Sequence, residues 1–114
     1  MKVIPDEVTF MYAQITHIRV PMGSMAQVRK VITDSYLPAV RMRPGFVSAM
    51  FLEQIDDPDS ARLIITWQDQ ASVEAFNSTG ALMSSVQSLS ATLPGVKVQR
   101  EGYVVTIRDE VALA

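Results

Sequence analysis

Cysteine is absent from the 114-residue chain, and histidine occurs once, at His17. The lack of cysteine excludes disulfides, thiolate metal sites and cysteine nucleophiles. A single histidine also excludes a multi-histidine metal site within one chain. No glycine-rich dinucleotide motif is present. The sequence therefore predicts a protein that needs no metal, flavin or other cofactor.

Long apolar runs and a basic stripe are also missing. No run approaches the roughly 20 apolar residues that span a bilayer, and the N-terminus lacks the apolar core of a signal peptide. Ten Lys and Arg are scattered among twelve Asp and Glu, which gives a net charge of −2. Such a pattern does not suit a phosphate backbone. We expect a cytoplasmic protein that binds neither membranes nor nucleic acid, and the cysteine-free composition suits a reducing compartment.

The length and the order of patterns indicate one domain, residues 1–114, with its core at about 10–107. Residues 9–20 are rich in β-branched and aromatic types and predict a strand that ends at Pro21. Residues 24–42 carry an apolar stripe at helical spacing, with Ser24 and Gln27 placed as a capping box. Pro38 predicts a kink in this helix, and the Pro44-Gly45 pair ends it.

The second half predicts a hairpin, a helix and a last strand. Residues 46–54 and 61–68 are the hairpin strands, joined by an acidic turn around Pro58. Asp69 is placed to cap a helix that runs to about residue 93, with a break at 78–80. Its apolar positions are Val73, Phe76, Leu82, Met83, Val86 and Leu89. Residues 96–107 form the last strand, with a bulge at Gly102.

This βαββαβ order predicts an α+β, ferredoxin-like fold with a four-stranded antiparallel sheet and two helices on one face. Apolar residues occur on both faces of the predicted strands. In the first hairpin strand, Phe46, Met50 and Leu52 alternate with Val47, Ala49 and Phe51. Because two helices cover only one face, the other face would expose a large apolar patch. We therefore predict a homodimer in which a second sheet covers it.

The segment "YLPAVRMRPGFVSAMFLEQIDDPDSARLIITWQDQASVEAFNST" resembles the central signature of the antibiotic biosynthesis monooxygenase family. The specific parts are "RPGF" and "TWQDQASVEAF", and the resemblance spans about residues 10–107. It implies a dimeric α+β barrel with a pocket between each subunit's helices and sheet. Family members include cofactor-free oxygenases that convert phenols to quinones, haem-degrading enzymes and proteins of unknown activity.

The resemblance also implies a role for Trp67, because the corresponding tryptophan of family members faces that pocket. Haem-degrading members pair it with an Asn on the first strand and a haem-ligating His on the second helix. The nearest positions here are Thr16 and Asn77. An amide is a poor iron ligand, so haem degradation is disfavoured.

Chemistry supplies a short set of candidate site residues. His17 is the only side chain that ordinarily titrates near neutral pH, so it is the candidate base by elimination, beside Trp67 as the second catalytic candidate. Trp67, Asn77, Tyr36 and Arg62 are the candidate substrate-binding residues. Each also has a structural interpretation: His17 or Arg62 as a polar strand residue, Trp67 or Tyr36 as core, and Asn77 as a surface residue before a helix break.

Two function classes remain open at this point. The first is a cofactor-independent monooxygenase that acts on a small aromatic or polyketide-like substrate. The second is a non-catalytic dimeric small-molecule-binding or stress-response protein of the same fold. A pocket that both His17 and Trp67 face would favour the enzyme, and a solvent-facing His17 would favour the binding protein.

Overall fold

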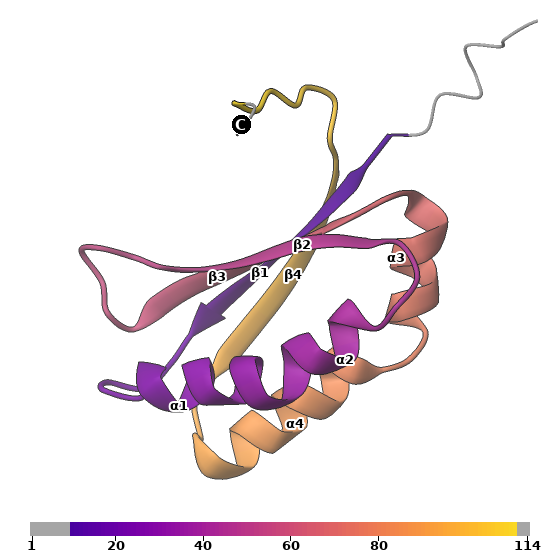
Figure 1. Cartoon of the computed structure of the whole chain (residues 1–114). Helices are drawn as coiled ribbons and strands as arrows, with labels where there is room; N and C mark the ends of the chain where they lie inside the picture. The colour runs from indigo at the N-terminus through magenta and orange to yellow at the C-terminus, as the bar shows by residue number, and fades with distance from the viewer. Residues whose placement is uncertain (1–9, 112–114) are drawn as a thin grey trace, which may run out of the picture.

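In residues 10–111, which this computed structural model describes, four antiparallel strands form one sheet with the helices on one of its faces (Figure 1). The strands are β1 (Tyr12–Arg19), β2 (Phe46–Glu53), β3 (Ser60–Trp67) and β4 (Lys97–Val104), and they lie in the order β2-β3-β1-β4. The helices are α1 (Met25–Val31), the π-helical segment η2 (Ile32–Tyr36), α2 (Leu37–Arg41), α3 (Gln70–Asn77) and α4 (Ala81–Thr92). The predicted ferredoxin-like fold is confirmed. Thr9 and the predicted domain boundaries at 1 and 114 lie outside the described residues.

The central strands β1 and β3 have one buried side and one half-exposed side. Alternate residues of β3 face the helices and are at most 3% exposed: Ala61, Leu63, Ile65 and Trp67. On β1 the corresponding buried positions are Gln14, Thr16 and Ile18. The period of two follows from the pleat of a strand. It is notable that two of the three buried β1 positions are polar, because such groups need partners.

The helix that follows β1 is continuous, but its middle turn is a π-helix. The predicted irregularity near Pro38 is found one turn earlier, at Ile32–Tyr36. Pro38 has no N–H to donate and its ring crowds the preceding turn, which explains why the helix widens before it. The predicted capping box is wrong: Ser24 makes no side-chain cap, and only its carbonyl accepts from the Gln27 N–H at 3.1 Å.

The hairpin of β2 and β3 contains a bulge that the sequence did not reveal. Phe46 pairs with Trp67 and Ser48 pairs with Thr66, so Val47 is an extra residue on β2. One extra residue reverses the alternation of faces. The predicted grouping of Phe46 with Met50 is therefore wrong, because Phe46 lies on the helix-covered face. At the hairpin tip the predicted proline turn is confirmed, since the Ser60 N–H donates to the Asp57 carbonyl across Pro58 at 3.1 Å.

The first turn of α3 is fixed by two close contacts. The Asp69 carboxylate accepts from the Ser72 N–H at 2.9 Å and from the Ser72 hydroxyl at 2.7 Å, which confirms the predicted cap. Gly45 lies against this turn with a φ of +87°, and a Cβ atom there would collide with the Ser72 hydroxyl. The Gly45 carbonyl also accepts from the Gln68 N–H at 2.7 Å. The "RPGF" turn thus anchors β2 to the start of α3.

The helix predicted from Asp69 to residue 93 is divided as expected, into α3 and α4, by the segment 78–80. Met83 is 61% exposed, so its predicted apolar position on the core side is wrong. The last strand pairs with β1 without a register shift from Lys97 to Val104, and the predicted bulge at Gly102 is therefore not found. Within residues 10–111 no helix is long and apolar enough to cross a lipid bilayer.

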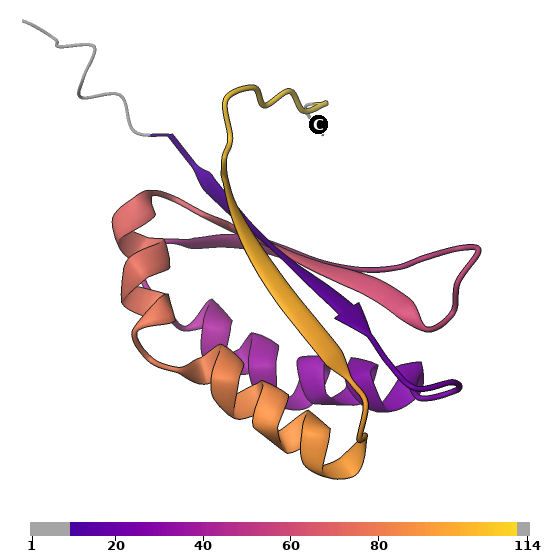
Figure 2. The same ribbon diagram turned by 180° about the vertical axis from the view of Figure 1, so that it is seen from behind.

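The sheet face opposite the helices, called the open face below, is apolar in one half and charged in the other. Its apolar half is centred on β2 and β3 and contains Met50, Leu52, Ile64 and Ile15. Its charged half is centred on β1 and β4 and contains His17, Arg19, Arg62, Lys97 and Glu101. Figure 2 shows the helices gathered on the other side of the sheet. The two faces therefore offer two separate places for chemistry.

Candidate functional site

A small cavity lies between the helix layer and the sheet. A water-sized sphere can occupy about 30 Å³ of it. Its walls come from β1, β3 and β4 on one side and from α1, η2 and α4 on the other. The lining residues are Thr16, Ile18, Val31, Ile32, Tyr36, Leu63, Leu82, Ser85, Val86, Leu89 and Val98. Most are aliphatic, so the cavity suits an apolar ligand that carries a few polar atoms.

Tyr36 is the predicted site residue that lines this cavity. Its side chain is only 4% exposed, and burial raises the pKa of its hydroxyl to about 12, although the charge of Arg100 opposes the shift. The ring packs edge-to-face on Phe76, with 6.0 Å between centroids. Among residues 10–111, neither the Tyr36 hydroxyl nor that of Thr16, which is 3% exposed, has a side-chain hydrogen-bond partner. The cavity is therefore lined by the hydroxyl groups of two buried residues that can bond to a ligand.

Trp67 is fully buried beside this cavity and is not one of its lining residues. Its ring packs on Phe76, at 5.2 Å between centroids, and edge-to-face on Phe46 at 6.1 Å. Because Phe76 touches both Trp67 and Tyr36, the three rings form one aromatic cluster. Trp67 thus packs against Phe76, and Phe76 packs against Tyr36, which lines the cavity.

A chain of side-chain hydrogen bonds fixes Trp67 from the other side. The indole N–H donates to the Gln14 side-chain carbonyl at 2.9 Å, and the Gln14 amide N–H₂ donates to the Asn77 side-chain carbonyl at 2.9 Å. Gln14 is 4% exposed, so both ends of a buried amide are satisfied. This arrangement leaves the Asn77 amide N–H₂ at the exposed end of the chain, where it can donate to another acceptor.

Gln14 is the residue that the sequence analysis missed. The resemblance matched the first-strand amide to Thr16, whereas the amide beside Trp67 belongs to Gln14, two residues earlier on the same face of β1. The register between β1 and β3 places Gln14 beside Trp67, because Trp67 pairs with Tyr12 and thus lies diagonally opposite Gln14. No local sequence signal marks Gln14, because its contact with Trp67 depends on the pairing of β1 with β3.

His17 lies on the open face, away from the cavity. Its Nε2 is 2.9 Å from a carboxylate oxygen of Glu101, and the Tyr103 hydroxyl donates to the same oxygen at 2.8 Å. These bonds from Tyr103 and His17 hold the pKa of Glu101 below its usual value. The hydrogen bond between Tyr103 and Glu101 also raises the pKa of the Tyr103 hydroxyl. The His17 side chain is 36% exposed, so it is half-buried and reachable from solvent.

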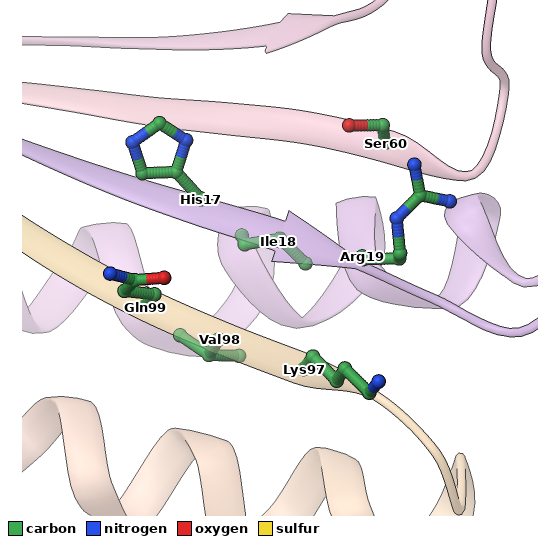
Figure 3. Close-up of a pocket in the computed structure, with 7 residues that line it drawn as sticks. All are labelled: His17, Ile18, Arg19, Ser60, Lys97, Val98 and Gln99. Carbon is green, nitrogen blue, oxygen red and sulfur yellow. The ribbon is translucent and has the colours of Figure 1, made fainter.

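Arg62 lies beside His17 on the open face, as its Cα partner across β1 and β3. A shallow hollow of about 280 Å³ opens at the end of the charged half, and its lining includes His17, Arg19, Ser60, Lys97 and Gln99 (Figure 3). Arg19 is already paired with Asp57 at 2.7 Å. The structure thus brings Trp67, Asn77 and Tyr36 to the helix side of the sheet, and His17 and Arg62 to the other side. In the described part of the chain, no three His, Cys, Asp or Glu side chains gather as a metal-binding group.

A comparison with protein-family models gives one match, to antibiotic biosynthesis monooxygenase, over residues 11–84. This range includes β1, both hairpin strands and α3, and therefore Gln14, Trp67 and Asn77. It also extends past Gly80 into the first turn of α4. A search of curated protein sequences finds no match.

Solved structures share the fold at low sequence identity. A variant of SnoaB, a cofactor-independent oxygenase from Streptomyces nogalater, superposes with a TM-score of 0.73 at 17% identity, covering 86% of this chain and 95% of its own. A protein of unknown function from Nitrosomonas europaea has a TM-score of 0.70 at 17% identity, covering 91% and 97%. A candidate antibiotic biosynthesis monooxygenase from Deinococcus radiodurans has a TM-score of 0.70 at 11% identity, covering 89% and 98%. At these identities the likeness supports the fold.

Proposed function

Because this chain belongs to the antibiotic biosynthesis monooxygenase family, we propose that it is a cofactor-independent monooxygenase acting on a small aromatic or polyketide-like substrate. The observation that carries the proposal is the apolar cavity between helices and sheet, which is lined by the hydroxyl groups of the buried residues Tyr36 and Thr16. An apolar pocket with a few convergent polar groups is the usual form of a small-molecule site. The similarity in fold to a cofactor-independent oxygenase agrees with this choice.

The proposed reaction needs no external reductant. One phenol and one dioxygen give one quinone and one water, and the substrate itself supplies the electrons. The substrate first loses its hydroxyl proton, because the phenolate is the electron-rich form that dioxygen attacks. Tyr36 would donate a hydrogen bond to that oxygen, and its raised pKa keeps the donor proton in place at neutral pH.

Trp67 and Asn77 have supporting roles in this proposal. Trp67 packs on Phe76, and Phe76 packs edge-to-face on Tyr36, so the Tyr36 ring that lines the cavity is held in place. Asn77, oriented by Gln14, keeps an amide N–H₂ that would donate to a carbonyl or phenolate oxygen of a ligand large enough to extend past the cavity lining. Gln14 positions both residues.

His17 and Arg62 enter the proposal in a different way. His17 remains the candidate base for the chain, and its Nε2 lies 2.9 Å from the Glu101 carboxylate. Its place on the open face separates it from a ligand in the cavity. We propose that a cavity-bound phenol gives its proton to solvent, and that His17 and Arg62 act on a ligand only if one binds at the open face.

The proposed assembly is a homodimer through the open face. Met50 is 58% exposed, Leu52 43% and Tyr103 47%, and all three lie on this face. Apolar groups gathered in this way on a soluble protein mark an interface. A second copy of the sheet would cover them, and a stable interface of this kind buries about 1,600 Å² in total.

The alternative function is a non-catalytic dimeric protein that binds a small molecule in the same cavity. The position of His17 favours it, because the chain then has no titratable base near neutral pH beside the ligand. Such a protein would bind aromatic compounds without consuming dioxygen. Both functions use the cavity, but only the monooxygenase converts its ligand to a product.

Dioxygen uptake with a panel of anthrones and hydroquinones, measured with and without a chelator, distinguishes the monooxygenase from the non-catalytic binding protein. The enzyme proposal expects one dioxygen consumed per quinone formed, at a rate that the chelator leaves unchanged. His17→Gln should then keep its rate within about twofold if the cavity is the site, while Tyr36→Phe loses about tenfold. Binding of the same compounds without dioxygen uptake would support the alternative. Uptake that the chelator abolishes would overturn the cofactor-independent mechanism.

A further inference from the structure

The cavity is too small for the ligands that its lining suits. A water-sized sphere finds about 30 Å³ there. An apolar cavity of about 150 Å³ is the size that admits benzene. Even a single aromatic ring therefore requires one of the walls to move outward. The wall that moves should be the one with the fewest hydrogen bonds and buried side chains.

The sheet and the α1–α2 helix are both fixed. The cavity-facing strand residues belong to β1, β3 and β4, which are hydrogen-bonded to one another along their length. The α1–α2 helix is anchored by the buried side chains Met25, Val28, Ile32, Tyr36 and Val40. Its Arg29 also forms an ion pair of 2.5 Å with Glu53 of β2. Opening either wall would break many packed contacts.

Helix α4 is attached more weakly. It contributes Leu82, Ser85, Val86 and Leu89 to the cavity, and only Leu89 is buried. Within residues 10–111, no side chain of α4 forms a hydrogen bond or ion pair with another helix or strand. The Thr92 hydroxyl does donate hydrogen bonds, but its acceptors are carbonyls of α4 itself. Figure 2 shows α4 lying alongside the α1–α2 helix beneath the sheet. Its attachment is apolar contact alone.

The chain can bend where α4 begins. Gly80 precedes the helix with a φ of +73°, and no heavy atom lies within 4 Å of where its Cβ would be. A glycine in this region adopts both signs of φ with little penalty. The Pro94-Gly95 pair follows the helix at its other end, next to the buried Leu93. Rotation of α4 about these ends would widen the cavity without disturbing the sheet.

The lining also restricts the chemistry of the ligand. None of the cavity residues carries a charge. The polar atoms are the hydroxyls of Thr16, Tyr36 and Ser85, which can both donate and accept. A ligand oxygen would supply these hydroxyls with a hydrogen-bond partner. The charge of Arg100 acts on Tyr36 from outside the lining. The lining itself offers a phenol donors, acceptors and an apolar wall.

We propose that α4 is a hinged lid that moves outward to admit a neutral single-ring phenol and closes over it. The proposal rests on the proposed function in that both use this cavity, and it adds the size of the ligand and the route of entry. Closure would bring Leu82 and Val86 onto the ring. A substrate with three fused rings would hold α4 open.

Amide hydrogen exchange by NMR, with phenol as the probe, tests the lid. In the free protein, α4 amides should exchange through a local opening that leaves β1 and β3 amides protected. Phenol at about ten times its dissociation constant should slow exchange of α4 amides about tenfold. Exchange of α4 only by global unfolding would overturn the lid.

Ser85→Leu is the matched variant, because it fills the cavity from α4, and Ser88→Leu, at an exposed position on the same helix, is its control. Phenol binding should be lost in the first and stay within about twofold in the second. If Ser85→Leu fails to fold, Val86→Ile fills less space and should weaken phenol binding several-fold. Binding of 1-naphthol but not phenol would overturn the single-ring ligand. If α4 opens locally but phenol, 1-naphthol and anthrone do not bind, the mobility of α4 is supported. The cavity is then not a ligand site, and both the ligand inferred here and the proposed function are refuted.

Discussion

The indole N–H of Trp67 donates a hydrogen bond of 2.9 Å to the side-chain carbonyl of Gln14, and both residues are almost completely buried. A buried tryptophan needs a partner for this N–H, and a buried amide needs partners for both of its ends. The bond to Asn77 completes the second requirement. The pair therefore links a strand residue, the single tryptophan and a helix end into one unit.

Replacing Gln14 by leucine should destabilise the protein by about 1–3 kcal/mol. The indole N–H would remain buried without an acceptor, which is more costly than losing the net value of one hydrogen bond. Chemical denaturation measures the change, and Gln87→Leu, at an exposed position of α4, controls for the change of residue type. Equal stability in both variants would show that the Gln14 bonds carry no net energy.

Replacing Trp67 should separate packing from hydrogen bonding. Trp67→Ala should lose about 3–5 kcal/mol, because a fully buried aromatic leaves a void against Phe46 and Phe76. Trp67→Phe keeps much of the ring volume and should lose less, mainly the bond to Gln14. Denaturation curves of the three proteins provide the test. A loss in Trp67→Phe as large as in Trp67→Ala would mean that the hydrogen bond dominates.

The emission of Trp67 also reports on the cavity, since the chain has no other tryptophan. Because Phe76 separates it from Tyr36, an aromatic ligand in the cavity should change its emission without direct stacking. We expect partial quenching that saturates with ligand concentration. No change at saturation would place the ligand elsewhere.

The fold could be predicted because its signals are local. The apolar stripe of residues 24–42, the turn around Pro58 and the Asp69 cap each determine one element, and their order determines the topology. The bulge at Val47 could not be predicted, since it depends on how β2 aligns with β3. The face of Phe46 was consequently assigned wrongly.

The candidate site was harder to predict for the same reason. Residue type suggested His17 as a base, but side-chain direction is set by strand register, and His17 occupies an outward position. Gln14 was overlooked because a glutamine in a strand has no signature of its own. Its importance appears only when Trp67 is brought next to it across the sheet. Chemistry that depends on pairing between distant segments is not contained in short motifs.

The open face should support a dimer that one charge can disrupt. Met50 is 58% exposed on this face, and Met83 is 61% exposed on α4, so the two methionines are matched in type and exposure. Met50→Glu would place a carboxylate inside the proposed interface and should give a monomer, whereas Met83→Glu should leave the dimer intact. Light scattering at micromolar concentration provides the measurement. A wild-type monomer of 12.6 kDa would contradict the assembly directly.

Tyr36 should make the protein less stable at alkaline pH. Burial raises the pKa of its hydroxyl from the usual 10 to about 12 in the folded state. The unfolded chain therefore loses this proton first, and the stability that the neutral hydroxyl contributes is fully present below pH 10 and is lost as the pH rises through about 12. A difference of this size corresponds to about 2–3 kcal/mol.

Tyr36→Phe removes that alkaline loss and tests the hydroxyl at neutral pH as well. At pH 7 the variant should match the wild type within about 1 kcal/mol, because removing a hydroxyl that lacks a side-chain partner among the described residues leaves no other group unpaired. Between pH 9 and 12 its free energy of unfolding should fall less than that of the wild type. Tyr12→Phe, which removes a hydroxyl that donates to Gln70, controls for the loss of a tyrosine hydroxyl as such. A loss above about 2 kcal/mol in Tyr36→Phe at pH 7 would mean that the hydroxyl is bound within the protein and is not free to meet a ligand.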